Sequence, residues 1–211
     1  MVKKTGIIKN LIDQKMVDYL LNYYEKLPKK DNGLRLNADT LVEQDFNHRF
    51  KEKLQNSITD YFNGEICHST IYSDYAPGGI HSDGYIDKPE EKSLAYTILI
   101  PLVSEYKENA TIVFNESSEK AITFNEATGL GNKGIRSYEQ EKLPKGDFMS
   151  ESFVKTYLSH LKVDQLPFTV DSVLYWSVGS ALYWPRQRFH VSANFSKNTV
   201  RKAIVILTNE N

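Results

Sequence analysis

The sequence lacks most features that would tie it to a membrane or an oxidising compartment. It has a single cysteine, Cys67, so no internal disulfide can form, and we expect a reducing, cytoplasmic location. No apolar run is long enough to span a bilayer, and the N-terminal residues lack the apolar stretch of a signal peptide. We therefore expect a soluble protein with no membrane partner.

Charge of one sign is also scarce, since the formal net charge is −1 and charged residues make up 25% of the chain. A nearly neutral protein has no general attraction to nucleic acids, so these are not an expected partner. A local basic groove with stacked aromatics would still be compatible with a single strand. At 211 residues the chain is expected to form one domain with a substantial core, and its oligomeric state stays open.

The first 64 residues have the periodicity of helices. Apolar residues recur at three- and four-residue spacing between Leu11 and Tyr23, and Pro28 ends that pattern. A polar loop is expected over residues 29–37. A second apolar stripe runs from Phe46 to Phe62 and is closed by Asn63-Gly64. This region is predicted to be a helical support for the rest of the chain.

From residue 65 onwards the chain is dominated by short β-branched and aromatic runs, which are typical of strands. The predicted strands are Ile66–Tyr75, Leu94–Val103, Ala110–Phe114, Ala121–Phe124, Ser172–Trp176, Ala181–Trp184, Phe189–Ala193 and Val200–Thr208. Such a series after a helical lead favours a mainly β fold, a double-stranded β-helix or jelly-roll barrel, over residues 65–208.

A polar, glycine-containing segment, residues 125–165, interrupts the strands and contains one expected short helix over residues 153–161. It is either an insertion over the mouth of the barrel or a variable surface excursion. It contains a literal G-x-G-x-x-G, Gly129 to Gly134. The polar sequence after it stops at Pro144 and offers no helix for a dinucleotide-binding unit, so we interpret it as a loop.

Two histidines and an aspartate form a candidate metal site. His81 and Asp83 lie two apart in an extended segment that follows a turn, so their side chains point the same way. His190, on a distant predicted strand, would complete the set. Two imidazoles and one carboxylate are the ligands of a ferrous iron that keeps three adjacent positions open. Those positions suit a bidentate 2-oxo acid plus dioxygen.

Arg201 opens the last predicted strand and shares a face with apolar residues, which is unusual for an arginine. A guanidinium there could hold the distal carboxylate of a dicarboxylate co-substrate through two parallel hydrogen bonds. Lys202 points the other way and is the reserve candidate. Arg186 and Arg188 flank the distal histidine and are either contacts for an anionic substrate or part of a solvated loop.

These elements resemble the Fe(II)/2-oxoglutarate-dependent oxygenase superfamily, near its phytanoyl-CoA dioxygenase and prolyl 4-hydroxylase-like branches. The resemblance covers about residues 66–208, with the insertion outside it. The matching elements are Tyr72, the turn at residues 77–79, His81-Ser-Asp83, the strand Tyr96–Leu102, Val178–Leu182, His190 and Arg201.

The resemblance implies that His81, Asp83 and His190 bind Fe(II) and that Arg201 binds the C5 carboxylate of 2-oxoglutarate. Tyr72 and Tyr96 are expected to line the pocket. Ascorbate is an optional additional cofactor. The implied reaction consumes dioxygen, releases succinate and carbon dioxide, and hydroxylates a C–H bond. Desaturation stays open, whereas Asp83 occupies the position that a halide would need.

Two other functions remain open at this point. One is a non-catalytic jelly-roll binding module, in which the site residues serve loop hydrogen bonds and the core. The other is a cupin-type metalloenzyme that does not use 2-oxoglutarate. The remaining histidines, His48, His68 and His160, are expected to be structural. The primary substrate is not legible from the sequence, because loops set specificity.

Overall fold

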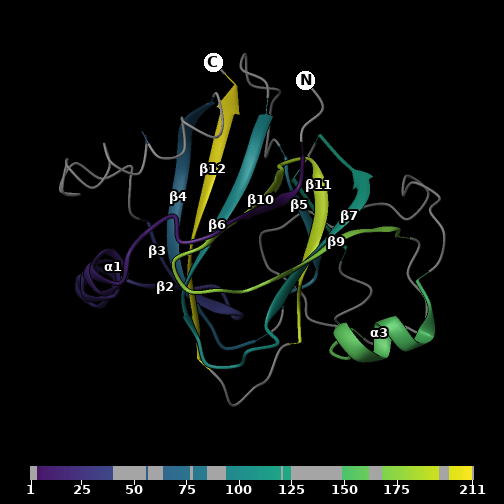
Figure 1. The fold of residues 1–211 in the computed structure, drawn as a ribbon, viewed down its shortest axis with the longest axis horizontal. Coiled ribbons are helices and arrows are strands. Elements are labelled where there is room, and N and C mark those ends of the chain that lie inside the picture. The colour runs from purple at the N-terminus through teal and green to yellow at the C-terminus, as the bar shows by residue number, and fades with distance from the viewer. Residues whose placement is uncertain are drawn as a thin grey trace.

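The structure is a computed structural model that describes residues 4–39, 56, 64–76, 78–84, 94–119, 121–124, 149–161, 168–194 and 200–210. Within these residues the strands form two antiparallel sheets that face each other (Figure 1). The larger sheet has the order β1 (Gly6–Ile8), β10 (Ala181–Pro185), β6 (Leu94–Ser104), β12 (Arg201–Glu210), β4 (Gly64–Asp74), β3 (Arg35–Asp39) and β2 (Lys30–Asp31). The smaller has the order β8 (Ala121–Phe124), β5 (Ile80–Asp83), β11 (Arg188–Ala193), β7 (Ala110–Ser117) and β9 (Val170–Tyr175).

The chain crosses repeatedly between the sheets. It passes from β4 in the larger sheet to β5 in the smaller, back to β6, and again to β7, and it crosses in the same way from β9 through β12. This alternation is the connectivity of a jelly roll. The predicted fold class is therefore confirmed.

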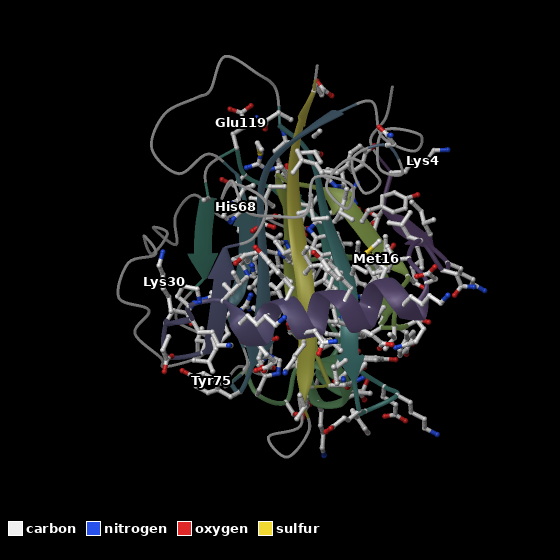
Figure 2. The ribbon with its side chains drawn as sticks, turned by 90° about the vertical axis from the view of Figure 1, so that its left-hand side faces the viewer. Lys4, Met16, Lys30, His68, Tyr75 and Glu119 are labelled. Carbon is white, nitrogen blue, oxygen red and sulfur yellow. The ribbon has the colours of Figure 1, made fainter. Side chains whose placement is uncertain are left out.

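Helix α1 (Gln14–Lys26) covers the outer face of the larger sheet, as Figure 2 shows. The helix begins after Asp13, whose carboxylate accepts a hydrogen bond from the backbone N–H of Met16 at 2.9 Å. Its buried side chains, Val17, Leu20 and Tyr24, pack with residues of the larger sheet. Helix α3 (Glu151–Tyr157) lies near the smaller sheet, where Val154 joins a cluster on that sheet's outer face.

The third part of the core fills the space between the sheets. On β12 the buried side chains alternate: Ala203 faces the barrel interior, whereas Ile204 and Ile206 face α1. Two tryptophans, Trp176 and Trp184, occupy the interior with small and branched aliphatic residues. Because alternate residues of each strand point inward, the inward positions of these strands determine which side chains can form a site.

The structure corrects one part of the predicted order and leaves others untested. Residues 29–37, expected to be a polar loop, contain β2 and part of β3, joined at Asn32-Gly33; Gly33 has a φ of +83°. The second apolar stripe and the G-x-G-x-x-G motif lie outside the described residues, apart from residue 56. Neither helix of the described chain is long and apolar enough to cross a membrane.

Candidate metal centre

Strands β5 and β11 bring the three predicted ligands together. His81 and His190 are direct cross-strand partners, and Asp83 follows two residues after His81 on the same face. The ligand atoms of all three lie within 4.8 Å of one another. The Nε2 atoms of His81 and His190 are 3.9 Å and 3.4 Å from the two carboxylate oxygens of Asp83. This spacing leaves room for one ion at the centre of the three.

Backbone carbonyls orient both imidazoles. The Nδ1 of His81 lies 3.0 Å from the carbonyl oxygen of Gly79, and the Nδ1 of His190 lies 3.1 Å from that of Arg188. A ring that donates its Nδ1–H to a carbonyl has its Nε2 lone pair free for a metal. The indole N–H of Trp184 is also 3.1 Å from the Nδ1 of His190. The Nδ1 atom cannot accept from the indole and donate to the carbonyl at the same time. A metal bound to Nε2 requires the proton on Nδ1, which then donates to the carbonyl of Arg188.

The protonation states suit metal binding. Burial, together with the neighbouring His81, lowers the pKa of His190 to about 4, so its ring is neutral near pH 7. Burial would raise the pKa of Asp83, but the two imidazoles and a hydrogen bond at 2.7 Å from the hydroxyl of Thr97 outweigh it and hold that pKa below its ordinary value. A neutral imidazole and an ionised carboxylate are the forms that bind metals.

Arg186 holds the backbone of Asp83 from both directions. The Asp83 N–H donates to the carbonyl of Arg186 at 3.0 Å, and the guanidinium Nε donates to the carbonyl of Asp83 at 3.1 Å. The same guanidinium donates through Nη1 to Asn209 Oδ1 at 2.7 Å and to the carbonyl of Thr208 at 3.3 Å. Through these hydrogen bonds the side chain connects the end of β5 to β12, which is a structural role.

A pocket opens from the three ligands into the barrel. Its cavity volume is about 60 Å³. Besides the triad, its walls include Tyr72, Leu99, Thr111, Trp184, Val205 and the guanidinium of Arg35. With Ser192, which also lines it, the pocket has a metal-ligating end, walls of mixed polar and apolar side chains, and a cationic group.

Arg201, the predicted anchor for the co-substrate, is fully buried on β12. Its guanidinium lies 4.2 Å from the ring centre of Trp176, with Nη2 3.9 Å from Asp74 Oδ2. Lys202 faces the opposite way and pairs with Glu25 of α1 at 2.7 Å. Of these two candidates, only Arg201 is on the side of the barrel interior.

The two predicted tyrosines occupy different faces. Tyr72 is 2% exposed, and it lines the pocket. Tyr96 packs in the outer cluster beneath α1, with its ring edge-on to Tyr183, so its expected role in the pocket is wrong. Its neighbour Thr97 points inward and contacts Asp83. Because side chains of successive strand residues point to opposite faces, Thr97 rather than Tyr96 faces the metal ligands.

The remaining predictions concern the two arginines that flank His190 and the three other histidines. Arg188 pairs with Asp171 at 2.9 Å, and neither it nor Arg186 is among the residues that line the pocket. His160, expected to be structural, has its Nε2 buried, and burial together with the charge of Arg201 lowers its pKa to about 4. His68 lies on β4, and His48 is outside the described residues.

The fold is shared with solved structures. An oxidoreductase of the 2OG-Fe(II) oxygenase family from Burkholderia pseudomallei superposes with a TM-score of 0.54 at 11% identity, covering 98% of this chain and 84% of that one. HygX from Streptomyces hygroscopicus, with nickel and 2-oxoglutarate bound, gives 0.58 at 10% identity, covering 99% and 84%. This is the fold of the Fe(II)/2-oxoglutarate-dependent oxygenases.

A third solved structure, EvdO2 from Micromonospora carbonacea var. aurantiaca complexed with 2-oxoglutarate, gives a TM-score of 0.57 at 10% identity over 99% of this chain and 87% of that one. No family model matches the chain, and no curated protein matches its sequence. The oxygenase fold and a cluster of two histidines and one aspartate are thus found together in one chain.

Proposed function

We propose that this protein is an Fe(II)- and 2-oxoglutarate-dependent dioxygenase that hydroxylates a C–H bond of an organic substrate. The observation that carries the proposal is the convergence of His81, Asp83 and His190 inside a barrel of the oxygenase fold. Two imidazole nitrogens and one carboxylate oxygen match the donor set of an iron centre with three adjacent open positions.

Fe(II) bound by these three side chains would supply the dioxygen chemistry, in which 2-oxoglutarate, dioxygen and a C–H substrate give succinate, carbon dioxide and the alcohol. The chain's own residues provide the surroundings. Gly79 and Arg188 orient the imidazoles, and Thr97 orients the carboxylate of Asp83. Leu99, Trp184 and Val205 in the pocket wall would limit the access of bulk water to the reacting groups.

Arg201 anchors the co-substrate in this proposal. It lies on the strand that contributes Val205 to the pocket wall, and side chains two and four residues apart on a strand share a face. Its guanidinium can form two parallel hydrogen bonds to the distal carboxylate of 2-oxoglutarate. Tyr72, which lines the same pocket as the metal ligands and lies against the guanidinium of Arg35, is the second proposed contact for the co-substrate.

The test is anaerobic addition of Fe(II) and then 2-oxoglutarate, followed by absorption spectroscopy. We expect a visible metal-to-ligand charge-transfer band in the wild type. His190→Ala should abolish the band because iron is lost, whereas His68→Ala, which changes a histidine outside the pocket, should keep it. Arg201→Gln should retain iron but require more 2-oxoglutarate to develop the band.

Each alternative function would give a different result. A binding module that has only the shape of the barrel would bind neither iron nor 2-oxoglutarate. A metalloenzyme that does not use 2-oxoglutarate would bind the metal and show no band. Either result in the folded wild-type protein would refute the proposed function.

A further inference from the structure

A second arginine, Arg35, lines the pocket and comes from a strand that carries no other proposed site residue. Arg35 lies on β3, and its backbone partner across the sheet is Asp74 of β4; Asp74 is in turn the cross-strand partner of Arg201 on β12. The three residues thus form one row across the larger sheet. The carboxylate of Asp74 is 3.1 Å from the Nε of Arg35 and 3.9 Å from Nη2 of Arg201.

The guanidinium of Arg35 packs against a residue of the pocket wall. It lies 4.3 Å from the ring centre of Tyr72 and lines the same pocket as the triad. Burial would lower the pKa of Arg35 itself, but Asp74, Tyr72 and Asp83 raise it overall. Arg35 is therefore a charged group in the same pocket as the metal centre.

The charges of the row Arg35, Asp74 and Arg201, counted together with a metal ion on Asp83, favour a dianion. Arg35, Arg201 and Asp74 together carry one surplus positive charge, and a divalent ion on Asp83 would carry another. A buried surplus charge is costly unless a ligand neutralises it. The two carboxylates of 2-oxoglutarate would balance both charges. An additional anionic group on the primary substrate would leave the pocket negative, so the count favours the co-substrate as the partner of Arg35.

We propose that Arg35 and Arg201 bind the distal carboxylate of 2-oxoglutarate together, with Asp74 as the positioning residue that sets the separation of the two guanidiniums. Arg35 is then a specificity-determining residue that selects a dicarboxylate over a 2-oxo monocarboxylate. This inference rests on the proposed function, since it assumes that 2-oxoglutarate binds in this pocket.

The experiment compares two ligands in Ni(II)-loaded protein by calorimetry. 2-Oxoglutarate has the distal carboxylate, and 2-oxobutyrate lacks it while keeping the chelating end. Losing a hydrogen bond between charged groups typically costs enough to reduce affinity about 10- to 100-fold. We expect Arg35→Gln to weaken 2-oxoglutarate binding by this factor and to change 2-oxobutyrate binding by less than about 2-fold, with Ni(II) affinity unchanged.

Lys202→Gln is the matched control. Lys202 is also a cation in an ion pair, its side chain is 21% exposed compared with 22% for Arg35, and it lies on the opposite face of β12. It should leave both affinities unchanged. Arg35→Lys keeps the charge without the two-pronged donor, and we expect an intermediate loss. It also provides the test if the glutamine variant does not fold.

Two outcomes would overturn the inference. If both Arg35 variants bind 2-oxoglutarate as the wild type does, Arg35 does not contact the co-substrate, and a role toward an anionic primary substrate becomes the alternative. If the two ligands lose affinity in parallel, Arg35 acts on the chelating end. In both cases the wild type still binds 2-oxoglutarate, whereas failure of the wild type to bind it would refute the proposed function.

Discussion

The contact between Arg186 and Asp83 allows an effect on metal affinity to be separated from an effect on stability. Arg186 is 6% exposed, and its guanidinium donates to the Asp83 carbonyl, to the Thr208 carbonyl and to Asn209 Oδ1. Arg186→Gln is too short to span these acceptors, so we expect the end of β5 to lose its attachment to β12.

The size of the effect depends on the bonds that are lost. Hydrogen bonds from a charged donor contribute about 1.5–3 kcal/mol each before the variant relaxes. We expect the free energy of unfolding of Arg186→Gln to fall by about 3 kcal/mol. Groups that orient a metal ligand typically affect metal affinity about 10- to 100-fold. The Ni(II) dissociation constant should therefore rise by about that factor.

The assay measures these two quantities separately. Urea unfolding of the metal-free protein gives the stability, and calorimetric titration with Ni(II) under native conditions gives the metal affinity. Arg188→Gln is the control, because it removes a neighbouring guanidinium that pairs with Asp171 and makes no side-chain contact with Asp83 among the described residues. An Arg186→Gln protein that loses stability but binds Ni(II) as tightly as the wild type would refute the positioning role.

Two other predictions concern a pair of glycines and a histidine. Gly179 has a φ of +76°, and a Cβ there would lie 2.6 Å from the carbonyl oxygen of Ile12, so Gly179→Ala should lower the unfolding free energy by about 2–4 kcal/mol. Gly33→Ala, at φ +83° with nothing within 4 Å of the added carbon, should lose only about 1–2 kcal/mol; equal losses in chemical denaturation would contradict the contact with Ile12. For His160 the pKa is about 4 in the folded protein and 6.5 in the unfolded chain, so the unfolded chain binds the proton first as the pH falls. The neutral, buried imidazole therefore contributes its full stability above pH 6.5, and this contribution is lost as the pH falls toward 4. Between about pH 7.5 and pH 5 this contributes about 2 kcal/mol at most, and His160→Gln should show a correspondingly smaller loss in urea unfolding over that range.

The sequence predicts the strands after residue 65 and the shared face of His81 and Asp83, because both depend on local patterns. The β-branched runs lie within a few residues of the observed strands, and a two-residue spacing in an extended segment is enough to put His81 and Asp83 on one face. The pairing of β5 with β11, which opposes His81 and His190, is long-range information that no local pattern contains.

The residues that sequence reasoning does not find are those whose roles depend on tertiary contacts. Arg35 falls in an expected polar loop, although Asn32-Gly33 is a recognisable hairpin signal. Tyr96 is a more conspicuous candidate than Thr97, and the composition of a strand does not say which of its faces turns inward. Arg186 contacts a backbone carbonyl, and such a partner leaves no trace in side-chain patterns.

The pairing of β5 has a mechanical consequence. The smaller sheet holds this four-residue strand to β11 through one register pair, His81 with His190, while its other edge meets the equally short β8. An ion bound by these two histidines and Asp83 would cross-link β5 and β11, which otherwise share one register pair. Metal binding would then also increase the stability of the pairing between β5 and β11 in this wall of the barrel.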